Sequence, residues 1–175
     1  PSDIDKNTGF VPIMFGCDNF FSYCAVPYTR GRERSRSEKE IINEIKKHLK
    51  KGKKRILILG QNVNSFRLNH AECGKNRNVK KIIPFARLLK KIDQIPYNFT
   101  FNFTSSNPHD FHSSLINILP KLKKWERILH LPLQSGDDEI LKKMNRKYSA
   151  HDYLQLILNL KSKILNLKLS TDIIV

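Results

Sequence analysis

The chain has 175 residues, of which 39% are hydrophobic and 27% charged, and this balance suits a globular domain and excludes a disordered chain. Lysine and arginine number 32 against 16 acidic residues, and the net charge of +16 favours a polyanionic partner such as nucleic acid. A drift of composition towards lysine, asparagine and isoleucine is the alternative explanation. No apolar run could span a bilayer and no signal peptide is visible, so we expect a cytoplasmic protein without a membrane partner.

Short apolar runs alternate with amphipathic helical patterns along the chain. The predicted strands span residues 10–15, 56–59, 99–103, 128–133 and 167–175. The predicted helices span residues 37–52, 84–96, 111–119, 138–144 and 149–164. Capping boxes at Ser37–Glu40 and Ser149–Asp152 mark two of the helix starts.

This alternation predicts an α/β fold with βαβ units and a parallel sheet. Such units close into a barrel or remain open, and the pattern alone does not choose between the two. In either case a functional site is expected where the strands end. Polar segments follow the first four predicted strands, at residues 16–36, 60–64, 104–108 and 134–136.

The loop after the first strand carries Cys17 and Cys24, and Cys73 lies in a later polar connection. An odd number of cysteines without a secretion signal argues against a disulfide framework. Two thiols on one loop at a strand end could hold a soft metal centre, and two unrelated core thiols are the alternative. Arginines at every second position of this loop could clamp phosphates, unless they form only a solvated, ion-paired loop: Arg30, Arg32, Arg34 and Arg36.

The residues around these cysteines resemble the cluster-binding loop of radical-SAM methylthiotransferases. That loop reads Cys-x-x-x-Cys-x-x-Cys, followed by Pro-Tyr-Thr-Arg-Gly-Arg-Glu. Cys17 matches its first cysteine, Cys24 the third, and Tyr23 the aromatic residue before the third. Phe21 stands at the position of the middle cysteine.

The resemblance continues in order along the whole chain. Its further motifs occupy residues 59–65, 104–108, 130–136, 143–148 and 170–175. Residues 27–30 and 60–64 are similar to the branch that acts on isopentenyl-adenosine of tRNA. The resemblance implies a partial (β/α) barrel of the radical-SAM type. It also implies that residues 1–175 form the central radical-SAM domain, incomplete at its C-terminal end, with an N-terminal domain and a C-terminal TRAM domain absent.

The same resemblance implies the cofactors and partners. Cys17 and Cys24 are the implied thiolate ligands of a 4Fe–4S cluster, whose open iron binds S-adenosylmethionine. A second 4Fe–4S cluster belongs to the missing N-terminal domain. The implied cofactor-binding residues are Tyr23, Gln61, Asn62, Ser105, Gln134, Ser135 and Asp172. The implied partners are tRNA and an electron-donor protein that the sequence does not identify, and a monomer is expected.

The sequence also predicts the environment of two side chains on the later strands. Asp172 is expected to be a buried carboxylate whose partner is either a backbone group or a ligand, because an unpaired buried charge is costly. His130 is expected to be a hydrogen-bonded core residue. The chain starts at Pro1 and ends on an apolar run, so we expect it to be part of a longer protein.

Three functions remain open at this stage. The first is a tRNA methylthiotransferase. The second is a cluster-deficient relative that only binds tRNA, because the phenyl ring of Phe21 has no lone pair for iron. Cys73 is a possible substitute ligand, and a free surface thiol is the alternative interpretation of this residue. The third is a sister enzyme that modifies another tRNA base or a ribosomal protein.

Overall fold

The computed structural model describes residues 6–67 and 82–174. The strands of this part of the chain are β1 (Thr8–Pro12), β2 (Met14–Phe15), β3 (Arg34–Ser35), β4 (Arg55–Leu59), β5 (Thr100–Phe103), β6 (Ile128–His130) and β7 (Lys168–Ser170). Its helices are α2 (Val26–Arg30), α3 (Glu38–Lys50), α4 (Pro84–Asp93), α5 (Ser113–Ile118), α6 (Asp138–Lys143) and α7 (Ala150–Lys163). Short 3-10 turns are η1 (Val63–Ser65), η2 (Pro108–Asp110) and η3 (Leu119–Lys121).

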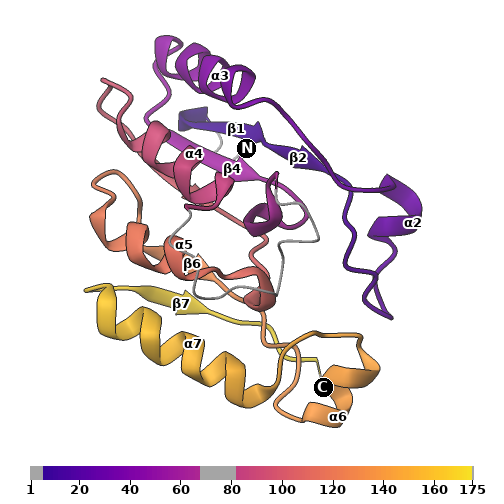
Figure 1. Cartoon of the computed structure of the whole chain (residues 1–175). Coiled ribbons are helices and arrows are strands. Elements are labelled where there is room, and N and C mark those ends of the chain that lie inside the picture. Colours follow the sequence, from indigo (N-terminus) through magenta and orange to yellow (C-terminus); the bar gives the residue numbers. More distant parts are fainter. Residues whose placement is uncertain (1–5, 68–81, 175) are drawn as a thin grey trace.

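The sheet is parallel and open. β1 pairs with β4 and β4 pairs with β5, with Ile56 of β4 opposite Gly9 and Phe101. β6 pairs with β7 as a separate parallel ladder, and a single bridge between Phe101 and Trp125 links the two ladders. The helices α3, α4, α5 and α7 lie in a row along the strands (Figure 1), and each contacts the next. The predicted partial (β/α) barrel is therefore confirmed.

The core forms between the sheet and this row of helices. Alternate residues of β4 are buried, so Ile56 and Ile58 face the core at 0% exposure. Helix α3 starts at the predicted capping box, in which Ser37 Oγ accepts from the backbone N–H of Glu40. Helix α7 starts at the second predicted box, where Ser149 accepts from Asp152 N. Each box satisfies backbone donors that the first turn of a helix leaves free.

Aromatic side chains pack where the two ladders meet. The ring of Phe103 meets Phe85 edge-on at 5.3 Å and stacks on Trp125 at 5.9 Å. Trp125 Nε1 donates to Asn102 Oδ1 at 3.0 Å, so its one polar group is satisfied inside the core. The single backbone bridge between the ladders is thus reinforced by packing.

Four predicted elements differ from the observed ones, and two of them, the strands predicted at 128–133 and 167–175, are only shorter, as β6 and β7. The predicted strand 10–15 is split, because after Pro12 the chain leaves β4 and pairs antiparallel with β3. The predicted helix 111–119 is the six-residue α5, which His112 caps and which gives way to the turn that contains Pro120. Within residues 6–67 and 82–174, no helix has the length and apolar character needed to cross a membrane.

Replacing Phe103 by alanine tests the aromatic join. Phe103 is 1% exposed, so Phe103→Ala should lower the free energy of unfolding by about 3–5 kcal/mol. Phe15→Ala is the control, because Phe15 is 48% exposed and its loss should cost less than about 1 kcal/mol. Denaturant unfolding followed by far-UV circular dichroism measures both, and equal losses would contradict the packing described here.

Candidate functional site

The loop between β2 and β3 is closed at its base by backbone contacts. Gly16 has φ +72°, and a Cβ there would lie 2.2 Å from the carbonyl oxygen of Arg32. The next residue, Cys17, donates its backbone N–H to Gly31 O at 3.2 Å. Only glycine permits this approach, so the sequence Gly16-Cys17 fixes where the first cysteine lies.

The two thiols of this loop are unlike in environment. Cys17 is 6% exposed and its Sγ accepts from Asn19 Nδ2 at 3.3 Å. Burial raises the pKa of the Cys17 thiol, although the hydrogen bonds from Asn19 oppose this. Cys24 is half-buried, and its backbone N–H donates to Phe21 O at 3.0 Å. Neither cysteine is in a disulfide.

The ligand set that the described residues offer to a metal centre is incomplete. Nowhere in residues 6–67 and 82–174 do three or more His, Cys, Asp or Glu side chains gather as a metal-binding group. Phe21, at the middle ligand position, carries a phenyl ring that lies 6.3 Å from the ring of Tyr23 in a stacked arrangement. Cys73 lies outside the described residues, so its predicted role as a substitute ligand stays a prediction. The residues therefore fit an Fe–S cluster only in part, with two thiolates.

The predicted cofactor-binding residues follow the carboxyl ends of four strands. Asn62 and Ser105 are neighbours, because Val63 N donates to Ser105 O at 3.2 Å. Gln134 and Asp172 are neighbours, because Gln134 N donates to Asp172 O at 2.9 Å. Gln61 is exposed, whereas Ser135 is 9% exposed and its Oγ accepts from Asp137 N. The strand ends thus bring these residues together in two pairs.

A buried polar network underlies the first pair. Asp110 Oδ2 accepts from Asn62 Nδ2 at 2.6 Å and from Asn107 Nδ2 at 2.9 Å. Asp110 Oδ1 lies 2.9 Å from His109 Nδ1. Asp110 is 6% exposed and Asn62 is 2% exposed. The carboxylate therefore orients the amide of Asn62, and this role of Asp110 is missed by reasoning from the sequence.

Three buried atoms beside this network have no hydrogen-bond partner among the described residues. They are Asn62 Oδ1, Asn64 Oδ1 and Ser106 Oγ. Buried polar atoms are normally satisfied by protein or by bound molecules. All three belong to the segments that follow β4 and β5, so this edge of the sheet fits a polar ligand such as the amino-acid or ribose part of a nucleoside cofactor.

The predicted burial of Asp172 is wrong. Its side chain is 65% exposed, because Asp172 follows the edge strand β7 and nothing described covers it. Its partner among the described residues is a side chain and not the predicted backbone group: His130 Nε2 lies 3.2 Å from the carboxylate, and His130 Nδ1 lies 2.9 Å from Ser170 Oγ. His130 is hydrogen-bonded as predicted, but it is half-buried and lies outside the core.

The four loop arginines do not share one extended segment. Arg30 is the last residue of α2 and Arg34 lies in β3, and both are exposed. Arg32 is exposed as well, with its guanidinium 3.3 Å from Asp18 and above the ring of Phe20. Arg36 turns inward, where it pairs with Glu44 at 2.6 Å and donates to Pro12 O at 2.7 Å. Three of the four are thus available to an anionic partner.

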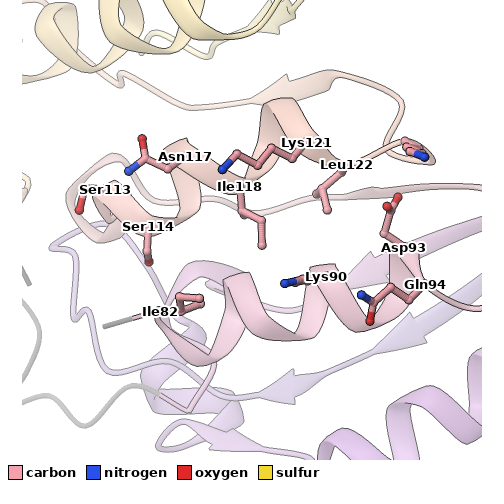
Figure 2. A pocket seen from close by; sticks show the side chains of 11 residues that line it. Ile82, Lys90, Asp93, Gln94, Ser113, Ser114, Asn117, Ile118, Lys121 and Leu122 are labelled. Carbon is pink, nitrogen blue, oxygen red and sulfur yellow. The ribbon is translucent and has the colours of Figure 1, made fainter. Parts of the chain in front are cut away.

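A groove lies elsewhere among the described residues. It encloses about 580 Å³ between α4 and the segment of α5 and η3, and Figure 2 shows Lys90 on its α4 side and Lys121 on the opposite side. None of its lining residues is a predicted site residue. The strand ends, and not this groove, therefore remain the candidate site.

Comparison with known proteins identifies relatives of the whole chain. Residues 11–175 match the family described as the Radical SAM superfamily. A tRNA-2-methylthio-N(6)-dimethylallyladenosine synthase of Fusobacterium nucleatum is 43% identical over 96% of this chain. Synthases of the same name from Clostridium botulinum strain Hall and Clostridium tetani are 45% and 44% identical over 95% and 100% of it. The chain spans 37%, 35% and 37% of the length of these three relatives.

Solved structures share the fold at low sequence identity. The radical S-adenosylmethionine methyltransferase TsrM from Kitasatospora setae, with cobalamin and a 4Fe–4S cluster bound, superposes with a TM-score of 0.68 at 16% identity, over 95% of this chain and 30% of its own. The cobalamin-dependent S-adenosylmethionine radical enzyme OxsB, with aqua-cobalamin and S-adenosylmethionine bound, gives 0.71 at 13% identity, over 94% and 23%. These likenesses establish the fold and nothing further.

Substitution of Asp110 tests the buried network. Asp110→Ala leaves the amides of Asn62 and Asn107 without their acceptor, and should lower the free energy of unfolding by about 2–4 kcal/mol. Glu139→Ala, at an exposed carboxylate, should change it by less than about 0.5 kcal/mol. Thermal unfolding compares the two, and equal effects would mean that the network does not hold the strand ends.

Proposed function

The chain belongs to the radical SAM superfamily, and we propose that it is the central part of a tRNA methylthiotransferase that acts on N6-dimethylallyladenosine. The observation that carries this proposal is the identity of 43–46% to synthases of that modification over at least 94% of the chain. The activity of the whole protein is a proposal, since the chain spans only about a third of the length of those relatives. We further propose that residues 1–175 form one domain, which other domains flank in the full-length protein.

The proposed cofactors are a 4Fe–4S cluster and S-adenosylmethionine. Together they supply one-electron chemistry on an unactivated carbon, which no protein side chain offers. Cys17 and Cys24 are the proposed thiolate ligands. The middle position is Phe21, so a third ligand must come from outside the described residues or from solution.

The strand ends are proposed to bind the polar parts of S-adenosylmethionine. Asn62 and Ser106 contribute buried oxygen atoms that lack protein partners within residues 6–67 and 82–174. Asp110 holds the Asn62 amide by its nitrogen, which leaves the amide oxygen to accept from a ligand donor such as an ammonium group. Gln61, Ser105, Gln134, Ser135 and Asp172 complete the proposed edge.

Tyr23 and the loop arginines are the proposed contacts for the adenine of the cofactor and for tRNA. Tyr23 is 47% exposed on the cysteine loop, and its ring is the proposed contact for the adenine. Arg30, Arg32 and Arg34 are exposed around the same loop and can contact tRNA phosphates. The net charge of +16 favours this partner through counterion release.

Iron content tests whether the loop of this chain holds a cluster. Full-length protein reconstituted anaerobically with iron and sulfide is compared with Cys17→Ala/Cys24→Ala, which removes this site and leaves any other. The natural protein should bind more iron than the double variant. Phe21→Cys should bind more still, approaching about four irons above that baseline, because it completes the three-thiolate set.

Two results would count against the proposal. If the natural protein binds no more iron than the double variant, this sequence lacks the cluster, and the cluster-deficient tRNA-binding relative becomes the better account. If Phe21→Cys gains no iron over the natural protein, residue 21 is not at a ligand position. The visible absorption of the desalted samples, recorded together with labile sulfide, separates a thiolate-bound cluster from adventitious iron and iron sulfide.

A further inference from the structure

The chain just after α6 contacts the tip of the cysteine loop, although more than a hundred residues separate them. Asn145 Nδ2 donates to Phe20 O at 2.9 Å, and Ser22 N donates to Met144 O at 3.2 Å. Figure 1 shows the loop that precedes α2 extending towards α6. The tip of the loop is therefore fixed by main-chain contacts on both sides of Phe21.

Arg146 is the centre of this contact. Its guanidinium carbon lies 3.7 Å from the centroid of the Phe21 ring, and 5.7 Å and 6.0 Å from the rings of Tyr23 and Tyr148. One of its terminal nitrogens donates to the Tyr23 hydroxyl. The planes of Phe21 and Tyr23 differ by only 14°. A planar guanidinium above an aromatic face is a favourable cation–π geometry, which a lysine ammonium reproduces less well.

The other end of Arg146 is anchored to the fold. Its backbone N–H donates to Leu141 O at 2.8 Å, at the end of α6. Tyr148, 7% exposed, hydrogen-bonds through its hydroxyl to the carbonyl oxygens of Pro132 and Leu133, just after β6. Arg146 thus connects the strand end of the second ladder to the loop that leaves the first.

We propose that Arg146 is a positioning residue that holds the cysteine loop closed through the ring of Phe21. Phe21 occupies a position where a thiolate would be tied to a metal, and its ring is tied to the guanidinium instead. The clasp formed by Phe21, Tyr23, Arg146 and Tyr148 therefore orders the loop before any cofactor binds. The contacts of the clasp are independent of the proposed function. Its purpose, which is to present Cys17 and Cys24 to a cluster, rests on that function.

The clasp predicts how fast the loop thiols react in metal-free full-length protein. A pulse of N-ethylmaleimide, followed by peptide mass spectrometry, gives the labelling rate of each cysteine separately. Arg146→Ala should raise the rate at Cys24 roughly tenfold, because labelling needs the loop to open and the cation–π contact opposes opening. Cys17, which is more deeply buried, should change in the same direction. The labelling rate in Arg146→Lys should lie between those of the natural protein and Arg146→Ala.

Coupling between the partners separates the clasp from a general loss of stability. Phe21→Leu should raise the rate by a large part of the effect of Arg146→Ala, which also loses the contacts to Tyr23 and Tyr148. The double variant should rise no further than Arg146→Ala, because the Phe21 contact is already lost there. Phe21→Tyr keeps the ring and should label at the natural rate. Arg55→Ala breaks the paired hydrogen bonds from Arg55 to Glu126 at the far end of β4, and should also label at the natural rate.

Three results would overturn the clasp. These are an unchanged rate in Arg146→Ala, independent and additive effects in the double variant, or an equal increase in Arg55→Ala. If Arg146→Ala does not fold, Phe21→Leu against Phe21→Tyr decides alone. Labelling requires neither cluster nor tRNA, so unchanged rates beside active enzyme would refute the clasp only, and predicted rates beside inactive enzyme would refute the proposed function only.

Discussion

Parallel pairing of β1, β4 and β5 is the constraint on which the site depends. Because these strands run in the same direction, their carboxyl ends meet at one edge, and the segments that follow them become neighbours. The hydrogen bond from Val63 N to Ser105 O is the direct consequence, since it joins the exits of β4 and β5. Asp110 then fixes the amides of Asn62 and Asn107 in the space so formed.

The cysteine loop meets this edge under a second constraint, its attachment at two places. The base is closed by Gly16 against the backbone of Arg32, and the tip is held by residues 144–148. The loop follows the first ladder, and residues 144–148 follow the second. The clasp therefore joins two ladders that share one backbone bridge within residues 6–67 and 82–174. Order at the thiols therefore depends on the whole open barrel, and the loop alone does not provide it.

Features written in local pattern could be predicted, and those that depend on distant partners could not. The capping boxes that begin at Ser37 and Ser149 each predict a helix start from four consecutive residues, and apolar runs predict the strands. The partial barrel therefore follows from the sequence. The exposure of Asp172 does not follow from the sequence, because burial of a strand end depends on which strand lies beside it. The roles of Asp110 and Arg146 do not follow from it either, since each contacts a residue at least 48 positions away and no periodicity in the sequence indicates such a contact.

The proposed activity of the full-length protein is methylthiolation of dimethylallyladenosine in tRNA. Mass spectrometry of nucleosides from total tRNA, in cells with and without the gene, tests it most directly. Loss of the 2-methylthio nucleoside, with accumulation of its dimethylallyladenosine precursor and restoration by the natural gene, is the predicted result. An unchanged level of the 2-methylthio nucleoside in cells that lack the gene would contradict the claim.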